Sequence, residues 1–510
     1  MDEIISRMTK LLGIDVGTGG TRAVLLDGAG RVAGSATSEH AAISAPQIGW
    51  AEQDPRDWWR ATCAAVKECL AQTGTRADEI AGIGLTGQMH GMVLLDSAGE
   101  VLRPALIWCD QRTEEQGRAI TAKIGAQRLI ELTANPALTN FTLTKIWWVQ
   151  QHEPQVWSRT ETILLPKDYA RFRLTGERAC DVADASGTLL FDVVRRRWSK
   201  EMMEASGIRA EQLPRVFESP EITGGISAEG ARATGLREGT PVVAGAGDQA
   251  AGAVGIGIVR PGAVSATIGT SGVVFAATSA PTLDPKGRIH TFCHAVPGRW
   301  HVMGVTQAAG YSLRWFRDEL CRTGDGAQTV SYSQLTAEAA KTSAGADGLL
   351  WLPYLMGERT PHLDPDARGA LVGLTAQHTR GHIVRAILEG VAFSLRDTLT
   401  IFKELQLPVQ SMRVGGGGAR SPLWRQIQAD VYGMPVEVLE AEEGAAYGAG
   451  LLAGVGVGAW PSVESACDAA VRVAERIDAD PRRVATMDRR YAEYRGLYPA
   501  LKETFHRAKA

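Results

Sequence analysis

The sequence has few cysteines, and their distribution excludes several classes of site. Seven cysteines occur in 510 residues, and no two have the CxxC or Cys/His spacing of a metal site. Small folds that depend on disulfides carry a much higher density of cysteine. We therefore expect neither a disulfide framework nor a zinc site, and a protein of a reducing compartment.

Long apolar runs and an excess of charge of one sign are also absent. No uncharged apolar stretch reaches the length of about 18 residues that a membrane-spanning helix needs. The first ten residues, MDEIISRMTK, contain acids and lack the apolar run of a signal peptide. The formal net charge is -3, which gives no strong field toward nucleic acid or an anionic membrane. These absences predict a soluble cytoplasmic protein without a nucleic-acid or membrane partner.

The length and a repeated pattern predict two large α/β domains. A single core stops growing beyond roughly 250–300 residues, and segments 11–30 and 262–281 repeat one pattern. LLGIDVGTGGTRAVLLDGAG and GAVSATIGTSGVVFAATSAP each contain two apolar runs joined by a Gly/Thr turn. This spacing predicts β-hairpins. We predict a duplicated fold with domains at 11–256 and 257–510, separated near the small-residue stretch 252–262.

Between and after these hairpins, strand and helix signals alternate. Asp54-Pro55 predicts a helix start, because the Asp can cap the helix and the Pro fits its first turn. Apolar residues from Val384 to Phe402 recur at helical spacing, and segments 80–85 and 411–415 have the pattern of strands. The alternation predicts α/β domains.

The first turn follows an acid. In DVGTGGTR, Asp15 ends an apolar run and is followed by glycines and Thr18. A carboxylate can hold Mg²⁺ or its waters, and turn amides can bind phosphate. An ordinary Gly-rich turn is the alternative. The partner turn TIGTSG, 267–272, favours the nucleotide, since two such turns can hold one triphosphate between them.

A second acid, Asp248, lies in the small-residue segment VVAGAGDQAAGAVG, 242–255. An apolar strand is followed by Asp248 at the start of a helix. A plain N-cap is one interpretation, since Asp is favoured there. The many flanking glycines and alanines instead favour a close approach of the backbone to a ligand.

Three further motifs predict ligand contacts. The glycine run in GGGGARSPLW, 415–424, can let an adenosine lie on bare backbone. In GQMHG, 87–91, a Gln and a His lie in an apolar neighbourhood and can bind sugar hydroxyls, although a lone His is more often structural. In WCDQR, 108–112, an acid and a base can serve a sugar or form a salt bridge with each other.

Taken together, the segments resemble the FGGY carbohydrate kinases of the actin-like ATPase superfamily, from about residue 11 to about residue 454. Among these the xylulokinases are most similar. FTLTKIWWVQ, with Lys145 and Trp148, resembles the first family signature, and the segment from Arg413 resembles the second. The other similar segments are GWAEQDPRDWW from Gly49, GQMHG from Gly87, LLPKDYARFRLTGE from Leu164, DVADASGT from Asp181 and LPYLMGERTPH from Leu352.

The resemblance implies two actin-like, ribonuclease H-like domains with the active site in the cleft between them. The domain 11–256 would carry the sugar and the catalytic base Asp248, and the domain 257–510 would carry the nucleotide. Asp15 would hold magnesium through water. The implied nucleotide residues are Asp15, Thr18, Gly19, Arg22, Gly269, Thr270, Ser271, Gly416, Gly417 and Ala419. The predicted sugar residues are Gln88, Met89, His90, Trp108 and Asp110.

The implied activity is transfer of phosphate from ATP to D-xylulose, with magnesium as cofactor, giving D-xylulose 5-phosphate. Met89-His90 differs from the Arg-Glu of glycerol kinases. Arg22 stands where many members have Lys, and Asn140 is unusual at the start of the first signature. Ribulose, gluconate or another ketose stays open as the substrate. An actin-like or chaperone-type ATPase is the alternative from another class, and a homodimer is left open.

Overall fold

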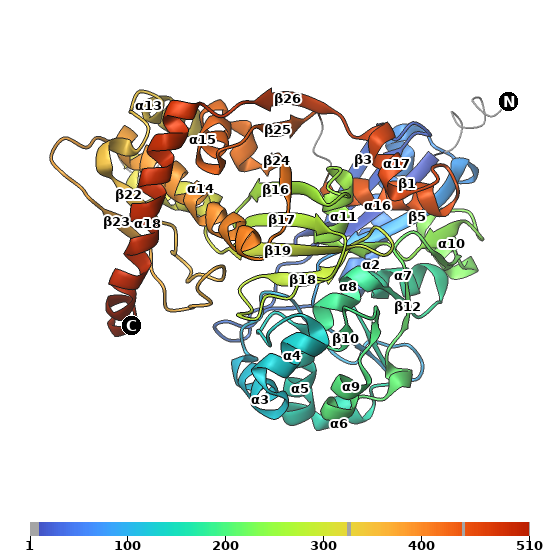
Figure 1. The fold of residues 1–510 in the computed structure, drawn as a ribbon. Coiled ribbons are helices and arrows are strands. Elements are labelled where there is room, and N and C mark those ends of the chain that lie inside the picture. The colour runs from blue at the N-terminus through green and yellow to red at the C-terminus, as the bar shows by residue number, and fades with distance from the viewer. Residues whose placement is uncertain (1–9, 324–327, 441–443, 509–510) are drawn as a thin grey trace.

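The computed structural model describes residues 10–323, 328–440 and 444–508, and its frame is a pair of seven-stranded sheets (Figure 1). Segment 1–9, which includes most of MDEIISRMTK, lies outside the described residues. Among the described helices, none combines the length and the apolarity needed to cross a membrane.

The first sheet has the order β13-β14-β5-β1-β2-β3, with β15 also paired to β5. Strand β1 is antiparallel to β2 and parallel to β5. The first predicted hairpin is therefore confirmed, and the predicted strand 80–85 is part of β5. The strands are β1 (Lys10–Val16), β2 (Gly20–Leu26), β3 (Val32–Glu39), β5 (Ile80–Gly87), β13 (Ile222–Gly225), β14 (Pro241–Val243) and β15 (Ala246–Gly247).

The second sheet repeats this plan in the order β18-β19-β17-β16-β24-β25-β26. Strand β16 is antiparallel to β17 and parallel to β24, as β1 is to β2 and β5. The duplication predicted from the two hairpins is thus present in the strand pairing. The strands are β16 (Gly262–Ile268), β17 (Gly272–Thr278), β18 (His290–Cys293), β19 (Trp300–Thr306), β24 (Val409–Gly416), β25 (Val436–Leu439) and β26 (Val473–Ile477).

Two small-residue helices, α11 (Asp248–Gly255) and α16 (Gly444–Gly456), pack between the sheets. Glycines allow this close packing: a Cβ on Gly13 would lie 1.8 Å from the Ala446 carbonyl oxygen, and one on Gly448 would lie 1.8 Å from that of Ala251. Apolar residues of α11 share one core with α16 and β1. Ala253 of α11 shares another with Phe275 of β17.

The outer faces of the sheets are covered by longer helices. On the first sheet, Trp58 of α2 and Leu174 of α7 share a core with Ile14 and Val16 of β1. Asp54 accepts a hydrogen bond from the Arg56 N–H at 2.9 Å, as expected for the cap of α2. The helices of the first half are α2 (Pro55–Thr73), α3 (Glu114–Ile124), α4 (Ala126–Thr133), α5 (Thr142–His152), α6 (Pro154–Ser158), α7 (Pro166–Thr175), α8 (Val182–Ala185), α9 (Lys200–Ser206) and α10 (Ala228–Thr234).

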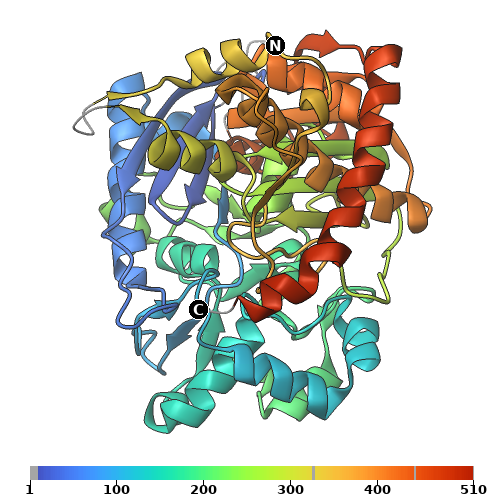
Figure 2. The same cartoon turned by 90° about the vertical axis from the view of Figure 1, so that its left-hand side faces the viewer.

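On the second sheet, the predicted long amphipathic helix is α14, and it shares a core with β16, β24 and the C-terminal helix α18. Figure 2 shows α18 along the outer side of the second half. The helices of the second half are α12 (Gly310–Trp315), α13 (Tyr332–Ala339), α14 (Arg380–Glu404), α15 (Pro422–Tyr432), α16, α17 (Val463–Ala470) and α18 (Pro481–Arg507).

Short strand pairs join the loops around this frame. Helices α3 to α6 and α9 form a separate lobe at the bottom of Figures 1 and 2. The division of the domains at 256/257 stays a prediction. Helix α16 of the second half packs on β1 and β5 of the first sheet, and α17 packs on α16 and α11. The short strands are β4 (Glu52–Gln53), β6 (Val93–Leu95), β7 (Ala105–Leu106), β8 (Thr162–Leu164), β9 (Ala179–Asp181), β10 (Phe191–Asp192), β11 (Arg197–Trp198), β12 (Arg215–Phe217), β20 (Arg322–Thr323), β21 (Gln328–Thr329), β22 (Leu350–Leu352) and β23 (Ala370–Val372).

Candidate active site

Three parallel strands of the first sheet bring the predicted base Asp248 and the predicted magnesium ligand Asp15 to one edge. Strand β5 lies between β1 and β15, and Thr86 of β5 is in register with both Asp15 and Ala246. The carboxyl ends of parallel strands share an edge of the sheet, and ligands of open α/β sheets bind there. Asp15 is the next-to-last residue of β1, the GQMHG loop begins at the last residue of β5, and Asp248 directly follows β15. The sheet itself thus places the two acids on either side of the loop.

Asp248 does not serve as the helix cap. Gly247 holds the N-cap position of α11, and Asp248 is the first helical residue. Its Oδ1 accepts a hydrogen bond from Gln249 Nε2 at 3.3 Å. Burial raises the pKa of the Asp248 carboxyl to about 6, against the hydrogen bonds from Gln249 that lower it. The group is therefore largely ionised at pH 7 and is a stronger base than an ordinary Asp.

Asp15 has the properties of a cation ligand. Burial and the neighbouring Asp248 raise the pKa of its carboxyl to about 7, while Arg22 lowers it. Arg22 lies directly across the hairpin from Asp15. Within the described chain, Oδ1 of Asp15 is buried and has no hydrogen-bond partner. A buried carboxylate oxygen without a partner, beside a second carboxylate, fits a magnesium ion or one of its waters.

The first Gly/Thr turn is held by hydrogen bonds from three other segments. The Thr18 carbonyl accepts from Gln53 Nε2 at 2.7 Å, and the Thr18 hydroxyl accepts from Trp108 Nε1 at 2.9 Å. The Gly19 carbonyl accepts from the His40 N–H at 3.0 Å. These hydrogen bonds occupy the carbonyl oxygens of Thr18 and Gly19, and Gly19 is exposed. The Gly17 N–H donates to the Gly20 carbonyl at 3.0 Å, so the turn amides that can bind an anion are those of Thr18 and Gly19.

The second turn lies beside the predicted adenosine segment. Ile268, directly before the turn, is in register with Gly416 at the end of β24. Gly416 has φ 72°, and a Cβ on it would lie 2.6 Å from the Ile268 carbonyl oxygen. The Thr270 carbonyl accepts from the Tyr311 N–H at 3.1 Å. The turn 269–271 and the glycine segment 416–419 therefore lie side by side, with their backbones in close contact.

The GQMHG loop is packed so tightly that glycines are required around it. A Cβ on Gly87 would lie 3.2 Å from Lys167 Cβ, and one on Gly91 would lie 2.5 Å from Pro166 Cγ. A Cβ on Gly247 would lie 2.9 Å from Met89 Sδ. Met89 is buried in the core of this region, and the loop thus contacts both α7 and the residue before Asp248.

Gln88 supports the first turn. Its Nε2 donates to Gln53 Oε1 at 2.9 Å, and its Oε1 accepts from the Thr18 hydroxyl at 3.3 Å. It is 1% exposed. Gln88 thus links the GQMHG loop to the first Gly/Thr turn, and its direct contact with a sugar stays a prediction.

His90 is a neutral hydrogen-bonding group. Its backbone has φ 68°, and Nδ1 lies 2.8 Å from the Gly187 carbonyl oxygen. A carbonyl only accepts, so Nδ1 carries the proton and Nε2 is an acceptor. Burial lowers the pKa of His90 to about 3. The ring contacts Phe141 at 5.0 Å and Phe292 of the second half at 6.0 Å between centroids.

Trp108 and Asp110 differ from each other in accessibility. Trp108 is 43% exposed and can contact a ligand while it donates to Thr18. Asp110 is fully buried: it pairs with Arg112 at 2.7 Å and accepts from the Ala51 N–H at 2.6 Å. Asp110 therefore forms the salt bridge that was the alternative prediction, and its assignment as a sugar contact is corrected. Its carboxylate instead holds Arg112, whose guanidinium lies 3.6 Å from the centroid of the Trp50 ring.

Two further residues near the loop, Asn140 and Arg359, were not among the predicted site residues. Asn140 is buried, and its Oδ1 has no partner among the described residues. Its neighbour Phe141 packs on His90. Burial is the main cause that lowers the pKa of His90 and of His290. The charge of Arg359, from the second half, lowers both pKa values further. Arg359 is part of the segment LPYLMGERTPH, but its position near His90 becomes apparent only in the folded structure, where the two halves meet.

Neither described cavity with a sizeable volume is lined by the predicted catalytic acids. A cavity of about 1010 Å³ lies beside Asp27–Val32, at the far end of the first hairpin. Another of about 300 Å³ lies between α14 and α18. The site at Asp15 and Asp248 is defined by strand ends and loops.

Comparisons with known proteins agree with this geometry. The FGGY family of carbohydrate kinases matches in two parts, its N-terminal domain at residues 10–255 and its C-terminal domain at 264–457. A xylulose kinase of Bacillus subtilis (strain 168) is 39% identical over 496 residues, covering 97% of this chain and 98% of the relative. A xylulose kinase of Escherichia coli (strain K12) is 41% identical over 443 residues, covering 87% and 89%.

Solved structures show the same fold. The crystal structure of a xyloylose kinase from Brucella ovis has a TM-score of 0.91 at 36% identity, covering 97% of this chain and 100% of that chain. The xylulose kinase from Rhodospirillum rubrum has a TM-score of 0.90 at 33% identity, covering 98% and 100%. The predicted pair of actin-like domains is confirmed, and the chain belongs to the FGGY family of carbohydrate kinases.

Proposed function

We propose that this protein transfers the γ-phosphoryl group of ATP to O5 of D-xylulose, giving ADP and D-xylulose 5-phosphate. The observation that carries the proposal is the pair of acids on either side of the GQMHG loop: Asp15, next to last in β1, and Asp248, directly after β15. Similarity to the xylulose kinases named above supports the choice of sugar.

Asp248 would act as the general base. As the sugar O5 forms its bond to the γ-phosphorus, the bond from that phosphorus to the ADP oxygen breaks, and the O5 proton moves to the Asp248 carboxylate. A pKa of about 6 leaves the carboxylate ionised at neutral pH. A base in this position typically contributes roughly 10²–10⁴-fold to the rate.

Asp15 would hold magnesium, directly or through water, by its unpartnered Oδ1. The bound ion would neutralise charge on the phosphate oxygens. The amides of the turns at Thr18 and Thr270 would bind phosphate from the two halves, and the segment 416–419 would bind adenosine. Alignment and charge stabilisation are the main demands of phosphoryl transfer.

The sugar would bind between the GQMHG loop and the second half. His90 Nε2 would accept a hydrogen bond from a sugar hydroxyl, and Asn140 Oδ1 and Arg359 lie in the same neighbourhood. Trp108 would cover the side near the phosphate turn. The seven unpaired thiols agree with a reducing cytoplasmic location.

The test is ADP release with magnesium and a panel of acceptors: D-xylulose, D-ribulose, gluconate, glycerol and no sugar. We expect kcat/KM for D-xylulose to exceed that of every other acceptor by at least about tenfold, a difference that a few hydrogen bonds can produce. A better turnover with another sugar would reassign the substrate. ADP release independent of sugar would favour an ATPase.

A further inference from the structure

A buried cluster of charged side chains lies beneath the sugar loop. Lys167 Nζ lies 2.5 Å from Asp168 Oδ1, 2.6 Å from Asp181 Oδ2 and 3.2 Å from Asp184 Oδ2. Asp168 also pairs with Arg171 at 2.7 Å. None of the five side chains is more than 1% exposed. The proposed reaction uses none of them directly.

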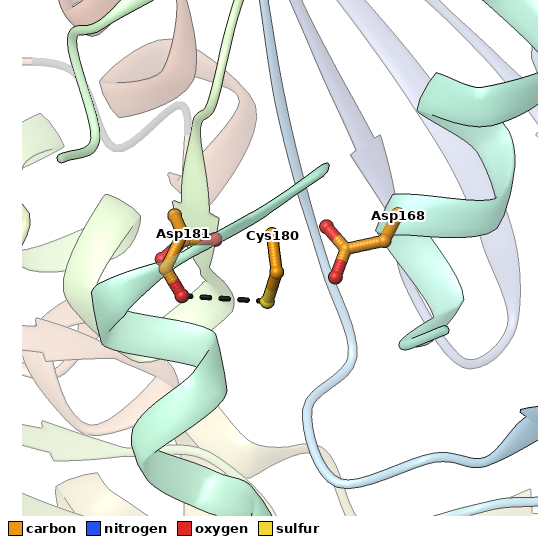
Figure 3. A group of neighbouring side chains, drawn as sticks. All are labelled: Asp168, Cys180 and Asp181. Carbon is orange, nitrogen blue, oxygen red and sulfur yellow. Dashed lines mark hydrogen bonds between the residues drawn. The ribbon is translucent and has the colours of Figure 1, made fainter. Parts of the chain in front are cut away.

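The ammonium group of Lys167 occupies the space between the acids that a bound metal ion would need. Ligand atoms of Asp168, Cys180 and Asp181 lie within 4.8 Å of one another, and Figure 3 shows that Asp168 faces the other two from a separate helix. The ammonium group of Lys167 already bridges Asp168 and Asp181. The arrangement is therefore an ion cluster with its cation built in.

The cluster is balanced by its own charges. Burial would lower the pKa of Lys167, but Asp168, Asp181 and Asp184 together raise it well above its ordinary value. Burial raises the pKa of Asp184 well above its ordinary value, and Lys167 opposes this shift only in part. Two cations thus face three carboxyl groups, of which Asp184 can retain a proton.

One arm of the cluster leads to His90. Asp181 caps α8, because its Oδ1 accepts from the Ala183 and Asp184 N–H groups at 2.8 and 2.9 Å. The chain then turns at Ser186, and the Gly187 carbonyl accepts from His90 Nδ1 at 2.8 Å. A Cβ on Gly187 would lie 2.7 Å from this nitrogen, so the two residues are in close contact. Displacement of α8 would therefore displace the His90 ring.

A second arm leads to Asp248. Arg171 donates from Nη1 to the Ala244 carbonyl at 2.6 Å and from Nη2 to the Ala179 carbonyl. Ala244 lies in the short connection between β14 and β15, and Asp248 directly follows β15. Gly245 in this connection has φ 72°, and a Cβ there would lie 1.8 Å from the Leu85 carbonyl oxygen. The strand end that carries Asp248 is thus fixed between Arg171 and β5.

We propose that Lys167 and its partners are positioning residues, which hold His90 and Asp248 in one fixed relation so that sugar and base meet correctly. This inference rests on the proposed function. Buried ion clusters contribute little net stability compared with apolar packing, while they can fix one geometry. An error of about 1 Å in the placement of reacting groups can cost about 100-fold in rate.

The test measures sugar affinity and turnover in Lys167→Met. We expect kcat to fall about 100-fold, and the Kd for D-xylulose without ATP, measured by calorimetry, to rise about tenfold. In a His90→Ala background, Lys167→Met should alter this Kd by less than about twofold. The effects of substitutions within one network are not additive, and the lysine would act on the sugar through His90. A merely structural role would give independent, additive effects.

Arg385→Met is the matched control, since it removes another buried ion pair, with Glu389 at 2.6 Å in α14. It should leave the sugar Kd within about twofold. If Lys167→Met does not fold, Asp184→Asn is a milder change that can be combined with His90→Ala in the same way. Folded variants with unchanged kcat and Kd, or with additive Kd effects, would overturn the positioning role. Failure of the wild type to bind D-xylulose would instead contradict the proposed function.

Discussion

The two halves use the same backbone plan with different chemistry. Strands β1 and β2 have 7 residues each, as do β16 and β17, and both pairs are joined by a Gly/Thr turn. In the first hairpin Asp15 lies opposite Arg22. In the second, Thr267 lies opposite Val273. The charged pair is thus present in one copy only.

The loops that follow the central strands differ in the same way. After β5, the loop carries His90, with side chains supporting it from several segments. After β24, the chain presents the glycines 416–418, and their bare backbone lies against Ile268. The repeated plan thus gives two similar Gly/Thr turns, while the first half adds two acids and a polar loop and the second half adds a bare backbone surface; in the proposed function the first would serve the sugar and the second the nucleotide.

The largest effect is expected from Asp248→Asn. Loss of the base should lower kcat by roughly 10²–10⁴-fold, while the Kd for D-xylulose changes only a few-fold because the shape of the site is kept. Steady-state kinetics and calorimetry on one preparation measure both. A variant that keeps more than about a tenth of wild-type kcat would show that another group takes the proton.

The comparison of equivalent positions predicts the next effect. Asp15→Asn should lower kcat/KM for MgATP by about 100-fold, because one charge-stabilising group is lost. Thr267→Val, at the matching place in the second hairpin, should lower it by less than about fivefold. Titration with magnesium should show weakened dependence on the ion only for the Asp15 variant. Equal losses at both positions would contradict the assignment of metal chemistry to one half.

A smaller effect is expected from His90→Ala. Loss of one hydrogen bond to a sugar hydroxyl should raise KM for D-xylulose by about tenfold, with KM for ATP unchanged. Because the pKa of His90 is about 3, wild-type KM should not vary between pH 6 and 8 through this residue. An unchanged KM for every sugar tested would remove His90 from the sugar site.

The smallest effect concerns the nucleotide surface. Gly416→Ala should raise KM for ATP several-fold and lower Tm, because φ 72° and the Ile268 carbonyl at 2.6 Å exclude a Cβ. The control is Gly496→Ala, because a Cβ there would meet nothing within 4 Å. Comparison of the Tm values of the two variants separates the local strain at Gly416 from the general effect of replacing a glycine. Equal Tm values would contradict the close approach.

Local signals in the sequence predicted much of the fold. The hairpins, the capped start of α2 and the amphipathic α14 follow from turn residues, an N-cap and helical periodicity, which act over a few neighbouring residues. The packing of α16 on the first sheet could not be predicted in this way, since it depends on complementary glycines far apart in the chain, such as Gly13 and Gly450.

The same limit applies to the site. Asp15 and Asp248 were found because an acid at a strand end among glycines has a recognisable pattern. Asp110 was assigned to the sugar although Arg112 and the Ala51 N–H occupy its carboxylate, and these contacts exist only in the fold. The segments LLPKDYARFRLTGE and DVADASGT were noted only for their resemblance to the family, and the sequence did not indicate that Lys167, Asp181 and Asp184 meet, because these residues lie in separate helices and a strand.

The most direct test of Asp248 as the base is the pH dependence of kcat/KM for D-xylulose at saturating magnesium and ATP, compared between wild type and Asp248→Asn. The ionised carboxylate is the active form, so wild-type kcat/KM should fall tenfold per pH unit below about pH 6, following the pKa of Asp248. Saturating magnesium should keep the Asp15 carboxyl ionised, so that its own pKa of about 7 adds no second limb, and the residual rate of Asp248→Asn should lack the acid limb. An acid limb retained unchanged in the variant, or a wild-type profile that stays flat to about pH 5, would contradict the account.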